Sequence, residues 1–385
     1  MFPKRVVDRL KQLPTPLYYY DLESLRKGLA VIQAQSSRYN YQVHYALKAN
    51  ANLPILAVVR EYGLGADCVS GNEVKRAVEA GFTPEQIVFA GVGKSDAEIN
   101  TALECGISCF NCESLQEMEI INQLAHIKGK KAQIALRINP NVNANTHKYI
   151  TTGLEENKFG INLWELESVV ARLENLHSLV LTGLHFHIGS QITDLSAFKS
   201  LCIRVNEIQG WFVSRKISIP HINVGGGLGV DYQEPDKNPY PDFKEYFALF
   251  NQFLEVRSGQ KVHFELGRAV VAQCGTLIAR VLYIKKGKNT NFAILDAGLT
   301  ELIRPALYQS YHSISNLSKP DGNQPPVLYD VVGPICESSD CFRKAVELPE
   351  TERGDLIAIR TAGAYGEVMA SSYNLRDRVE AVYSV

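Results

Sequence analysis

Short apolar runs alternate with longer amphipathic stretches along most of the chain. Eight of these runs have the length and composition of buried strands: 43–47, 65–68, 87–90, 108–110, 132–138, 179–186, 221–224 and 262–265. Stretches of helical periodicity follow them at 53–62, 72–80, 95–104, 114–125, 163–173, 196–215 and 243–256, several beginning at a capping Ser, Asp or Asn. A parallel barrel closes at eight strand–helix repeats, so the pattern predicts an α/β fold with a (β/α)8 TIM-type barrel.

The pattern changes after Arg268 to strand-like runs separated by turn residues, at 275–283, 291–297, 327–332, 355–361 and 378–383. These runs predict a second, all-β C-terminal domain. The run 16–20 precedes a helix expected near Asp21, so we expect the N-terminus to join this domain. The predicted division is a barrel over 25–267 and a β-sandwich or β-barrel domain made of 1–24 plus 268–385.

The composition favours an enzyme that acts on a small molecule. Of the 385 residues 45% are hydrophobic, and 40 Lys and Arg nearly balance 41 Asp and Glu, so there is no basic surplus for nucleic acid. No apolar stretch approaches the roughly 18 residues of a membrane span, and residues 1–13 carry charges throughout, so we expect a cytoplasmic protein with no membrane partner. The eight cysteines contain no pair of CxxC motifs and are expected to be free thiols.

Lys48 ends the first predicted strand, behind an apolar run that would partly desolvate its amine. A desolvated lysine has a lowered pKa and can attack an aldehyde. A single lysine after a strand is, however, usually a solvated loop residue. Other motifs are needed to favour the chemical role.

The glycines Gly225, Gly226 and Gly227 follow the seventh predicted strand. The segment lacks the Lys-Ser/Thr of a nucleotide P-loop, and Val230 stands where a dinucleotide fingerprint has glycine or alanine. Consecutive glycines can still let backbone N–H groups approach a phosphate. A flexible turn would explain the same residues.

Glu265 ends the last predicted barrel strand, and Arg268 follows three residues later. A carboxylate here could pair with a protonated pyridine nitrogen, and a structural salt bridge would explain the same spacing. His185 and His187 lie on the sixth strand, and we expect only one of them to point into the barrel mouth. Amine, histidine, phosphate loop and carboxylate together are the groups that hold pyridoxal phosphate.

The chain resembles the alanine-racemase-like, fold-type III pyridoxal phosphate enzymes, and among them the family of diaminopimelate decarboxylases. The resemblance covers nearly the whole chain. Its motifs are His-Tyr-Ala-Leu-Lys-Ala-Asn, Gly-Ala-Asp-Cys-Val-Ser-Gly-Asn-Glu, Asn-Lys-Phe-Gly-Ile, His-Phe-His-Ile-Gly-Ser-Gln, Glu-Leu-Gly-Arg, Gly-Pro-Ile-Cys-Glu-Ser and Gly-Ala-Tyr-Gly.

The resemblance implies a role for each matching residue. Lys48 carries the cofactor, His187 stacks on its ring, Glu265 pairs with the pyridine nitrogen, and Asp67 supports the site near the lysine. The residues implied to hold the phosphate are Ser190, Gly225, Gly226, Gly227, Gly267, Arg268 and Tyr365. The residues implied to bind substrate are Arg268, Arg304, Tyr308, Glu337 and Tyr365, and no metal is expected.

The implied reaction is decarboxylation of meso-2,6-diaminopimelate at its D-centre to L-lysine, the last step of lysine biosynthesis. Arg304 and Glu337 offer a cation and an anion for the distal carboxylate and ammonium of that substrate. Cys336 is the implied proton donor to the product carbon. In the family Cys336 and Glu337 reach the neighbouring chain's pocket, so the resemblance implies a homodimer with shared active sites.

Three other interpretations are compatible with the sequence. A related decarboxylase could act on ornithine, arginine or lysine. A non-catalytic pyridoxal phosphate carrier would share Lys48 and the glycine loop but would have no use for a second domain. Cys105, Cys109 and Cys112 match the spacing of an iron–sulfur site, although buried thiols explain them better because strand residues alternate between faces.

Overall fold

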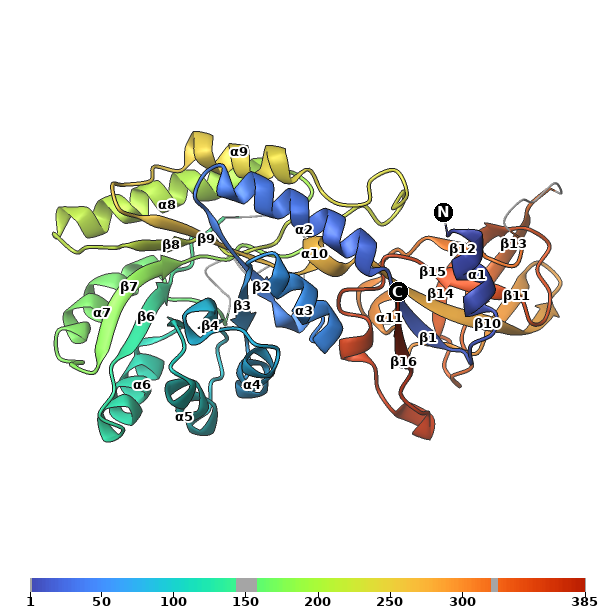
Figure 1. Cartoon of the computed structure of the whole chain (residues 1–385), viewed down its shortest axis with the longest axis horizontal. Helices are drawn as coiled ribbons and strands as arrows, with labels where there is room; N and C mark the ends of the chain where they lie inside the picture. The colour runs from blue at the N-terminus through green and yellow to red at the C-terminus, as the bar shows by residue number, and fades with distance from the viewer. Residues whose placement is uncertain (1, 143–157, 320–324, 385) are drawn as a thin grey trace. The chain divides into compact units, whose positions relative to one another are not determined.

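The computed structural model describes residues 2–142, 158–319 and 325–384, which divide into two compact units (Figure 1). Unit 2 comprises Lys27–Gly229 and Asp242–Gly267, and unit 1 comprises Met1–Arg26, Val230–Pro241 and Arg268–Val385. The segment Val230–Pro241, which the sequence pattern includes in the barrel, packs with unit 1. Its Tyr232 and Asp236 accept hydrogen bonds from arginines of that unit.

Unit 2 is a closed parallel barrel of eight strands, so the predicted fold class is confirmed. The strands are β2 (Gln42–Ala46), β3 (Gly65–Cys68), β4 (Ile87–Phe89), β5 (Cys109–Cys112), β6 (Ala132–Arg137), β7 (Leu179–His185), β8 (His221–Asn223) and β9 (Lys261–Leu266). The strands pair in chain order, and β9 closes the ring on β2 with Glu265 opposite His44. All eight carboxyl ends therefore lie at the same end of the barrel.

Helices lie outside this ring of strands (Figure 1). They are α2 (Leu22–Ser37), α3 (Leu53–Glu61), α4 (Gly71–Glu79), α5 (Asp96–Cys105), α6 (Leu115–Ile127), α7 (Leu166–Leu173), α8 (Ser196–Ser214) and α9 (Phe243–Phe253). The hydroxyls of Ser95 and Ser114 cap α5 and α6 as expected, whereas the helix expected to begin at Asn72 is capped by Ser70. The helix expected over 163–173 begins instead as a 3-10 turn, Leu163–Glu165.

The outer face of β9 explains why Glu265 points inward. Phe264 packs edge-on against Phe247 and Phe250 of α9, with ring centres 5.0 Å apart in both pairs. Each such aromatic contact contributes about 0.5–1.5 kcal/mol beyond the area it buries. Because neighbouring strand residues point to opposite faces, Phe264 in the helix layer fixes Glu265 inside the barrel.

Three histidines form a hydrogen-bonded row inside the barrel. His44 Nδ1 lies 3.3 Å from the Gln86 carbonyl, His44 Nε2 lies 3.1 Å from His263 Nδ1, and His263 Nε2 lies 2.9 Å from His221 Nδ1. A carbonyl can only accept, so all three rings donate from Nδ1, and His44 and His263 accept at Nε2. Burial lowers the pKa of all three, that of His263 to about 2, so the row is neutral.

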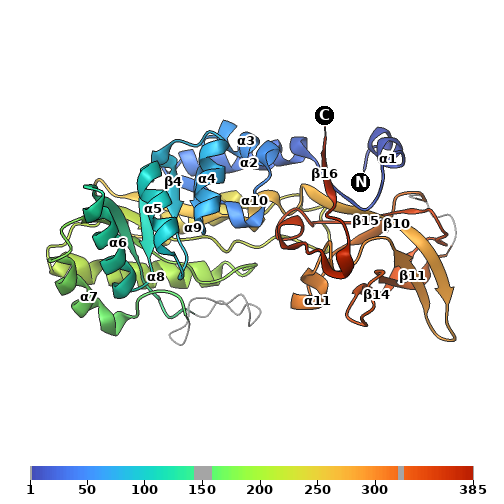
Figure 2. The same ribbon diagram turned by 90° about the horizontal axis from the view of Figure 1, so that it is seen from below.

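Unit 1 is built around an eight-stranded sheet, seen from below in Figure 2. Its strands are β1 (Leu17–Tyr20), β10 (Gly275–Lys286), β11 (Asn291–Leu295), β12 (Ile314–Asn316), β13 (Val327–Val332), β14 (Cys341–Leu348), β15 (Leu356–Ile359) and β16 (Glu380–Tyr383), with short helices α1 (Lys4–Leu10), α10 (Arg268–Val271) and α11 (Arg304–Tyr308). The sheet order is β12-β15-β10-β11-β13-β14. β1 pairs antiparallel with β10 and parallel with β16, so the N-terminal strand does join this sheet.

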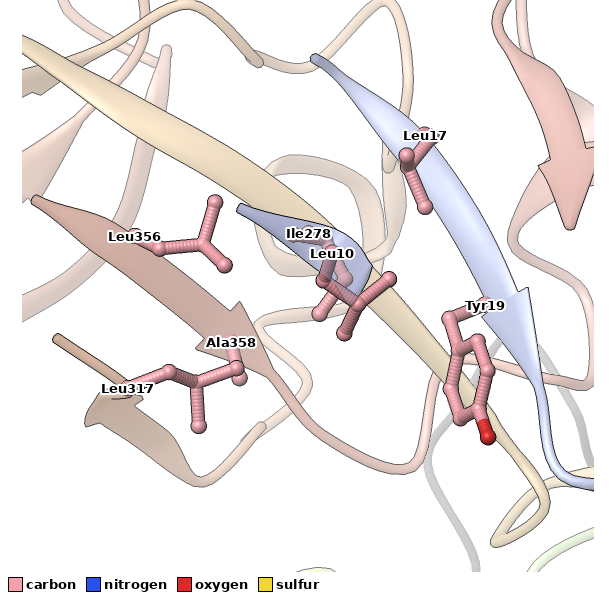
Figure 3. Close-up of a cluster of buried hydrophobic side chains, with 7 residues drawn as sticks. All are labelled: Leu10, Leu17, Tyr19, Ile278, Leu317, Leu356 and Ala358. Carbon is pink, nitrogen blue, oxygen red and sulfur yellow. The ribbon is translucent and has the colours of Figure 1, made fainter. Parts of the chain in front are cut away.

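An apolar cluster on this sheet anchors the N-terminus (Figure 3). Leu10 of α1 is fully buried against side chains of three strands and the turn after β12: Leu17, Tyr19, Ile278, Leu317, Leu356 and Ala358. Burying one such leucine contributes about 1.5–3 kcal/mol. In the described part of the chain, no helix is long and apolar enough to cross a bilayer. The cytoplasmic location stays a prediction.

Candidate active site

A buried carboxylate near the carboxyl end of the barrel accepts hydrogen bonds from three side chains. Glu265 Oε2 accepts from His185 Nε2 at 2.9 Å, and Oε1 accepts from Asn111 Nδ2 at 3.1 Å and Asn223 Nδ2 at 2.7 Å. An ionised carboxylate has about four acceptor sites, so one site remains for a further donor. Strands β5, β7, β8 and β9 each supply one member of this group.

The charge of Glu265 is set by its neighbours. Burial raises its pKa, but His185 and then Lys48 lower it by more, and the net shift is well below the usual range. The group is therefore a permanent anion. Such an anion is suited to hold a positively charged ring nitrogen.

Lys48 lies in the 3-10 turn Leu47–Ala49 that follows β2, and 38% of its side chain is exposed. Its Nζ is 3.6 Å from Oδ2 of Asp67, which is fully buried on β3. Neither Asp67 oxygen has a hydrogen-bond partner among the described residues. Burial and then Glu265 raise the pKa of Asp67, and an ion pair this long does not cancel them.

The glycine loop after β8 packs directly against neighbouring backbone. A Cβ on Gly226 would lie 1.8 Å from the Glu265 carbonyl oxygen, and one on Gly225, whose φ is +71°, would lie 2.2 Å from that of Phe186. Only glycine fits at these positions. Asn223 Oδ1 accepts from Gly225 N at 2.9 Å, which ties the loop to the Glu265 group.

His187 faces this loop, because its Nδ1 accepts from Gly226 N at 3.3 Å. Burial and then the charge of Arg137 hold the pKa of His187 well below its usual value, so its ring is neutral. The expectation that only one histidine points into the barrel mouth is wrong. His185 donates to Glu265, and His187, which lies two residues beyond the end of β7, also interacts with that carboxylate.

A buried ion pair that the sequence pattern does not single out borders the same end of the barrel. Arg137 Nη1 lies 2.6 Å from Glu113 Oε1, and Gly160 N donates to Glu113 Oε2 at 2.8 Å. Gly160 belongs to the Asn-Lys-Phe-Gly-Ile motif, whose Asn157 lies outside the described residues. The pair fixes the chain that returns to the barrel after β6.

Of the remaining predicted residues, Ser190 and Gly267 belong to unit 2, and the others belong to unit 1. Arg268 begins α10 and is 7% exposed, and Arg304 begins α11 and is 4% exposed. Tyr232, which the sequence pattern does not single out, accepts a hydrogen bond from each of them. The guanidinium of Arg268 also lies 4.8 Å from the ring centre of Tyr365. Tyr308 ends α11 and is half-buried.

Cys336 and Glu337 are exposed on the loop that joins β13 to β14. Asp340 holds this loop, because its carboxylate accepts from Leu299 N at 2.6 Å and Ile335 N at 2.7 Å. The loop thus presents a thiol and a carboxylate side by side at the surface of the single chain.

The three cysteines with iron–sulfur spacing do not converge. Cys105 ends α5, and Cys109 and Cys112 are the two ends of β5, where residues three apart point to opposite faces. Burial raises the pKa of Cys109 to about 12. In residues 2–142, 158–319 and 325–384 no three His, Cys, Asp or Glu side chains are placed to hold one metal ion.

Comparison with known proteins matches residues 23–272 to the family described as pyridoxal-dependent decarboxylase, pyridoxal binding domain. A diaminopimelate decarboxylase of Bacteroides thetaiotaomicron is 56% identical over 372 residues, which are 96% of each chain. One of Helicobacter pylori strain J99 is 41% identical over 95% of this chain and 89% of the relative.

Solved structures agree with these relatives. The diaminopimelate decarboxylase of Helicobacter pylori in complex with L-lysine has a TM-score of 0.91 at 39% identity, over 98% of this chain and 93% of that one. The enzyme of M. jannaschii in co-complex with L-lysine has a TM-score of 0.89 at 34% identity, over 98% and 89% of the two chains.

Proposed function

This chain belongs to the pyridoxal-dependent decarboxylases, and on that premise we propose that it decarboxylates meso-2,6-diaminopimelate at the D-centre to L-lysine and carbon dioxide. The main support for this substrate is the 56% identity with a diaminopimelate decarboxylase over 96% of both chains. The protein is thus a carbon–carbon lyase that depends on pyridoxal phosphate.

The barrel residues fit the cofactor. When bound, pyridoxal phosphate supplies an aldehyde that joins amines and a ring that accepts the electrons left by a departing carboxylate. Lys48 offers an accessible amine, Glu265 keeps one acceptor site for the ring nitrogen, and the glycine loop has no side chains that would keep a phosphate from its backbone. Neither oxygen of the buried Asp67 carboxylate has a hydrogen-bond partner among the described residues, so this carboxylate could accept a hydrogen bond from a bound group.

Each barrel residue then has one task in our proposal. Lys48 would hold the cofactor through its side-chain amine. Glu265 would stabilise a proton on the ring nitrogen, and the neutral ring of His187 would contact the cofactor ring. Asp67 fixes the Lys48 amine. Ser190, Gly225 to Gly227, Gly267 and Arg268 hold the phosphate together with Tyr365.

The residues of unit 1 support the choice of substrate. We propose that Arg304 and Glu337 bind the distal carboxylate and ammonium of diaminopimelate, with Arg268, Tyr308 and Tyr365 contributing further contacts. A decarboxylase that forms a diamine has no distal carboxylate to bind, so a buried arginine in its site would have no negatively charged partner. Arg304 is buried, and its hydrogen-bond partners are Tyr232 and His312 rather than a carboxylate.

We propose that Cys336 returns the proton to the product carbon and that the enzyme is a homodimer. Cys336 and Glu337 would serve the active site of the neighbouring chain. Both residues are exposed in the single chain, on the loop that Asp340 fixes. A proton donor needs to be shielded from water, and a neighbouring chain would provide that shielding.

The test is carbon dioxide release from the purified holoenzyme with meso-diaminopimelate, ornithine, arginine and lysine as separate substrates. We expect release from meso-diaminopimelate and at least about a hundredfold lower kcat/KM with the others, because each lacks the distal carboxylate. Release from ornithine alone would overturn the substrate. A pyridoxal phosphate carrier, the second candidate, would release none from any of them.

A further inference from the structure

Two buried arginines of unit 1 share one tyrosine oxygen. Arg268 Nη1 donates to Tyr232 Oη at 2.6 Å, and Arg304 Nη1 donates to the same oxygen at 2.8 Å. The three residues are 7%, 4% and 9% exposed for Arg268, Arg304 and Tyr232. A phenol oxygen has two lone pairs, so the two guanidinium groups use its full acceptor capacity.

A second contact fixes the orientation of Arg304. His312 Nδ1 donates to the Arg360 carbonyl at 2.8 Å, which leaves the Nε2 lone pair facing Arg304 Nη1 at 3.5 Å. Both hydrogens of Nη1 are therefore directed at Tyr232 and His312. The edge formed by Nε and Nη2 stays available, and Nε is buried with no hydrogen-bond partner among the described residues.

The cluster of Arg268, Arg304 and Tyr232 has the charges of a site that binds an anion. Burial and then Arg268 lower the pKa of Arg304, while Tyr232 acts in the opposite direction. Burial raises the pKa of Tyr232, but the two guanidinium groups outweigh it, and the net shift is downward. A buried cation without an opposite charge is costly, and the Nε–Nη2 edge of arginine matches the two oxygens of a carboxylate.

We infer that Tyr232 is a positioning residue that determines substrate specificity: with His312 it occupies Nη1 of Arg304 and aims the Nε–Nη2 edge at a carboxylate remote from the reacting carbon. The inference rests on the proposed function, because the remote carboxylate is that of diaminopimelate. Tyr232 acts through the arginines and touches no reacting atom.

The test compares two ligands of the holoenzyme by isothermal titration. L-lysine and pentane-1,5-diamine share both amines, and only L-lysine has a carboxylate. In Tyr232→Phe we expect L-lysine to bind roughly ten- to a hundredfold more weakly, the usual effect of losing a hydrogen bond to a charged group. Binding of pentane-1,5-diamine should change less than about twofold. KM for meso-diaminopimelate should rise with the L-lysine effect, while kcat falls less than about threefold.

Two further variants complete the design. Tyr246→Phe is the matched control, because its buried hydroxyl has no partner among the described residues, and it should bind L-lysine as the wild type does. Tyr232→His keeps a ring with one acceptor nitrogen and should restore part of the L-lysine affinity. It also tests the inference if Tyr232→Phe does not fold.

Equal affinity of wild type and Tyr232→Phe for L-lysine would overturn the inference, as would equal weakening of both ligands. These outcomes are separate from failure of the proposed function. An inactive wild-type holoenzyme with meso-diaminopimelate would overturn that function, whereas an active wild type with an unaffected Tyr232→Phe would overturn the inference alone.

Discussion

His185 Nε2 lies 2.9 Å from Glu265 Oε2, and the two side chains are only 1% and 4% exposed. An ionised carboxylate can only accept, so the proton lies on Nε2 of His185. The contact makes the histidine a fixed donor to the carboxylate that we assign to the cofactor's ring nitrogen. It also connects two motifs that stand far apart in the sequence.

Glu265→Gln should lower kcat by roughly a hundredfold or more, because an amide cannot hold the ring nitrogen in its charged form. The variant should still bind pyridoxal phosphate, which its visible absorbance will report. Carbon dioxide release with saturating substrate measures the change. Glu255→Gln, at an exposed residue of the same unit, is the control, and an unchanged kcat in Glu265→Gln would rule out this role.

The free energy of unfolding should fall as the pH is lowered from 7 to 5. Histidines of the unfolded chain bind protons near pH 6.5, whereas the buried histidines of the folded chain stay neutral. Burial lowers the pKa of His263 to about 2, so its share of the loss is up to about 2 kcal/mol. Between pH 7 and pH 5 the free energy of unfolding of His263→Gln should fall by about 2 kcal/mol less than that of the wild type.

Urea unfolding of the wild type, His263→Gln and the exposed-site control His126→Gln at pH 7 and pH 5 measures the difference. The comparison uses the change with pH within each protein, so a lower overall stability of one variant does not affect it. Parallel losses in the wild type and His263→Gln would contradict a neutral buried row.

Cys336 should be slow to alkylate in the assembled enzyme, because we place it in the neighbouring chain's active site. In the single chain it is exposed, whereas Cys68, Cys112, Cys202 and Cys274 are buried. Iodoacetamide labelling of native enzyme with and without L-lysine, followed by peptide mapping, gives the rate at each thiol. Rapid labelling of Cys336 that L-lysine does not slow would argue against its placement at the site.

Mixing inactive Lys48→Ala with inactive Cys336→Ala should restore activity. If each active site takes Lys48 from one chain and Cys336 from the other, half of the randomly formed dimers have one intact site, and about a quarter of all sites are active. Activity after mixing and reassociation measures this. Two variants that stay inactive together while forming mixed dimers would show that each site is built from a single chain.

Periodicity predicts the barrel well, because each of its strands is a short apolar run between helices with caps of their own. In unit 1 the sequence pattern does not indicate β14, since Cys341–Leu348 carries the charged residues Arg343, Lys344 and Glu347. It also does not indicate α1 or β12. These elements are short and owe their stability to the neighbours they pack on, which local pattern does not reveal.

The site is predictable where chemistry is concentrated in a motif, as at Lys48 and Glu265. It is not predictable where the structure alone brings residues together. Asn111 donates to Glu265 across 154 residues, and Tyr232 joins Arg268 and Arg304 from a segment between two barrel elements. A polar residue at the end of a barrel strand, such as Asn223 or, one residue earlier, Asn111, is the available signal.

The most direct measurement of the central claim is reduction of the holoenzyme with borohydride, which fixes the cofactor to the lysine that carries it, followed by peptide mapping. We predict a single pyridoxyl label on Lys48, and neither label nor carbon dioxide release in Lys48→Ala. A label on any other lysine, or an unlabelled protein that still decarboxylates meso-diaminopimelate, would contradict the account.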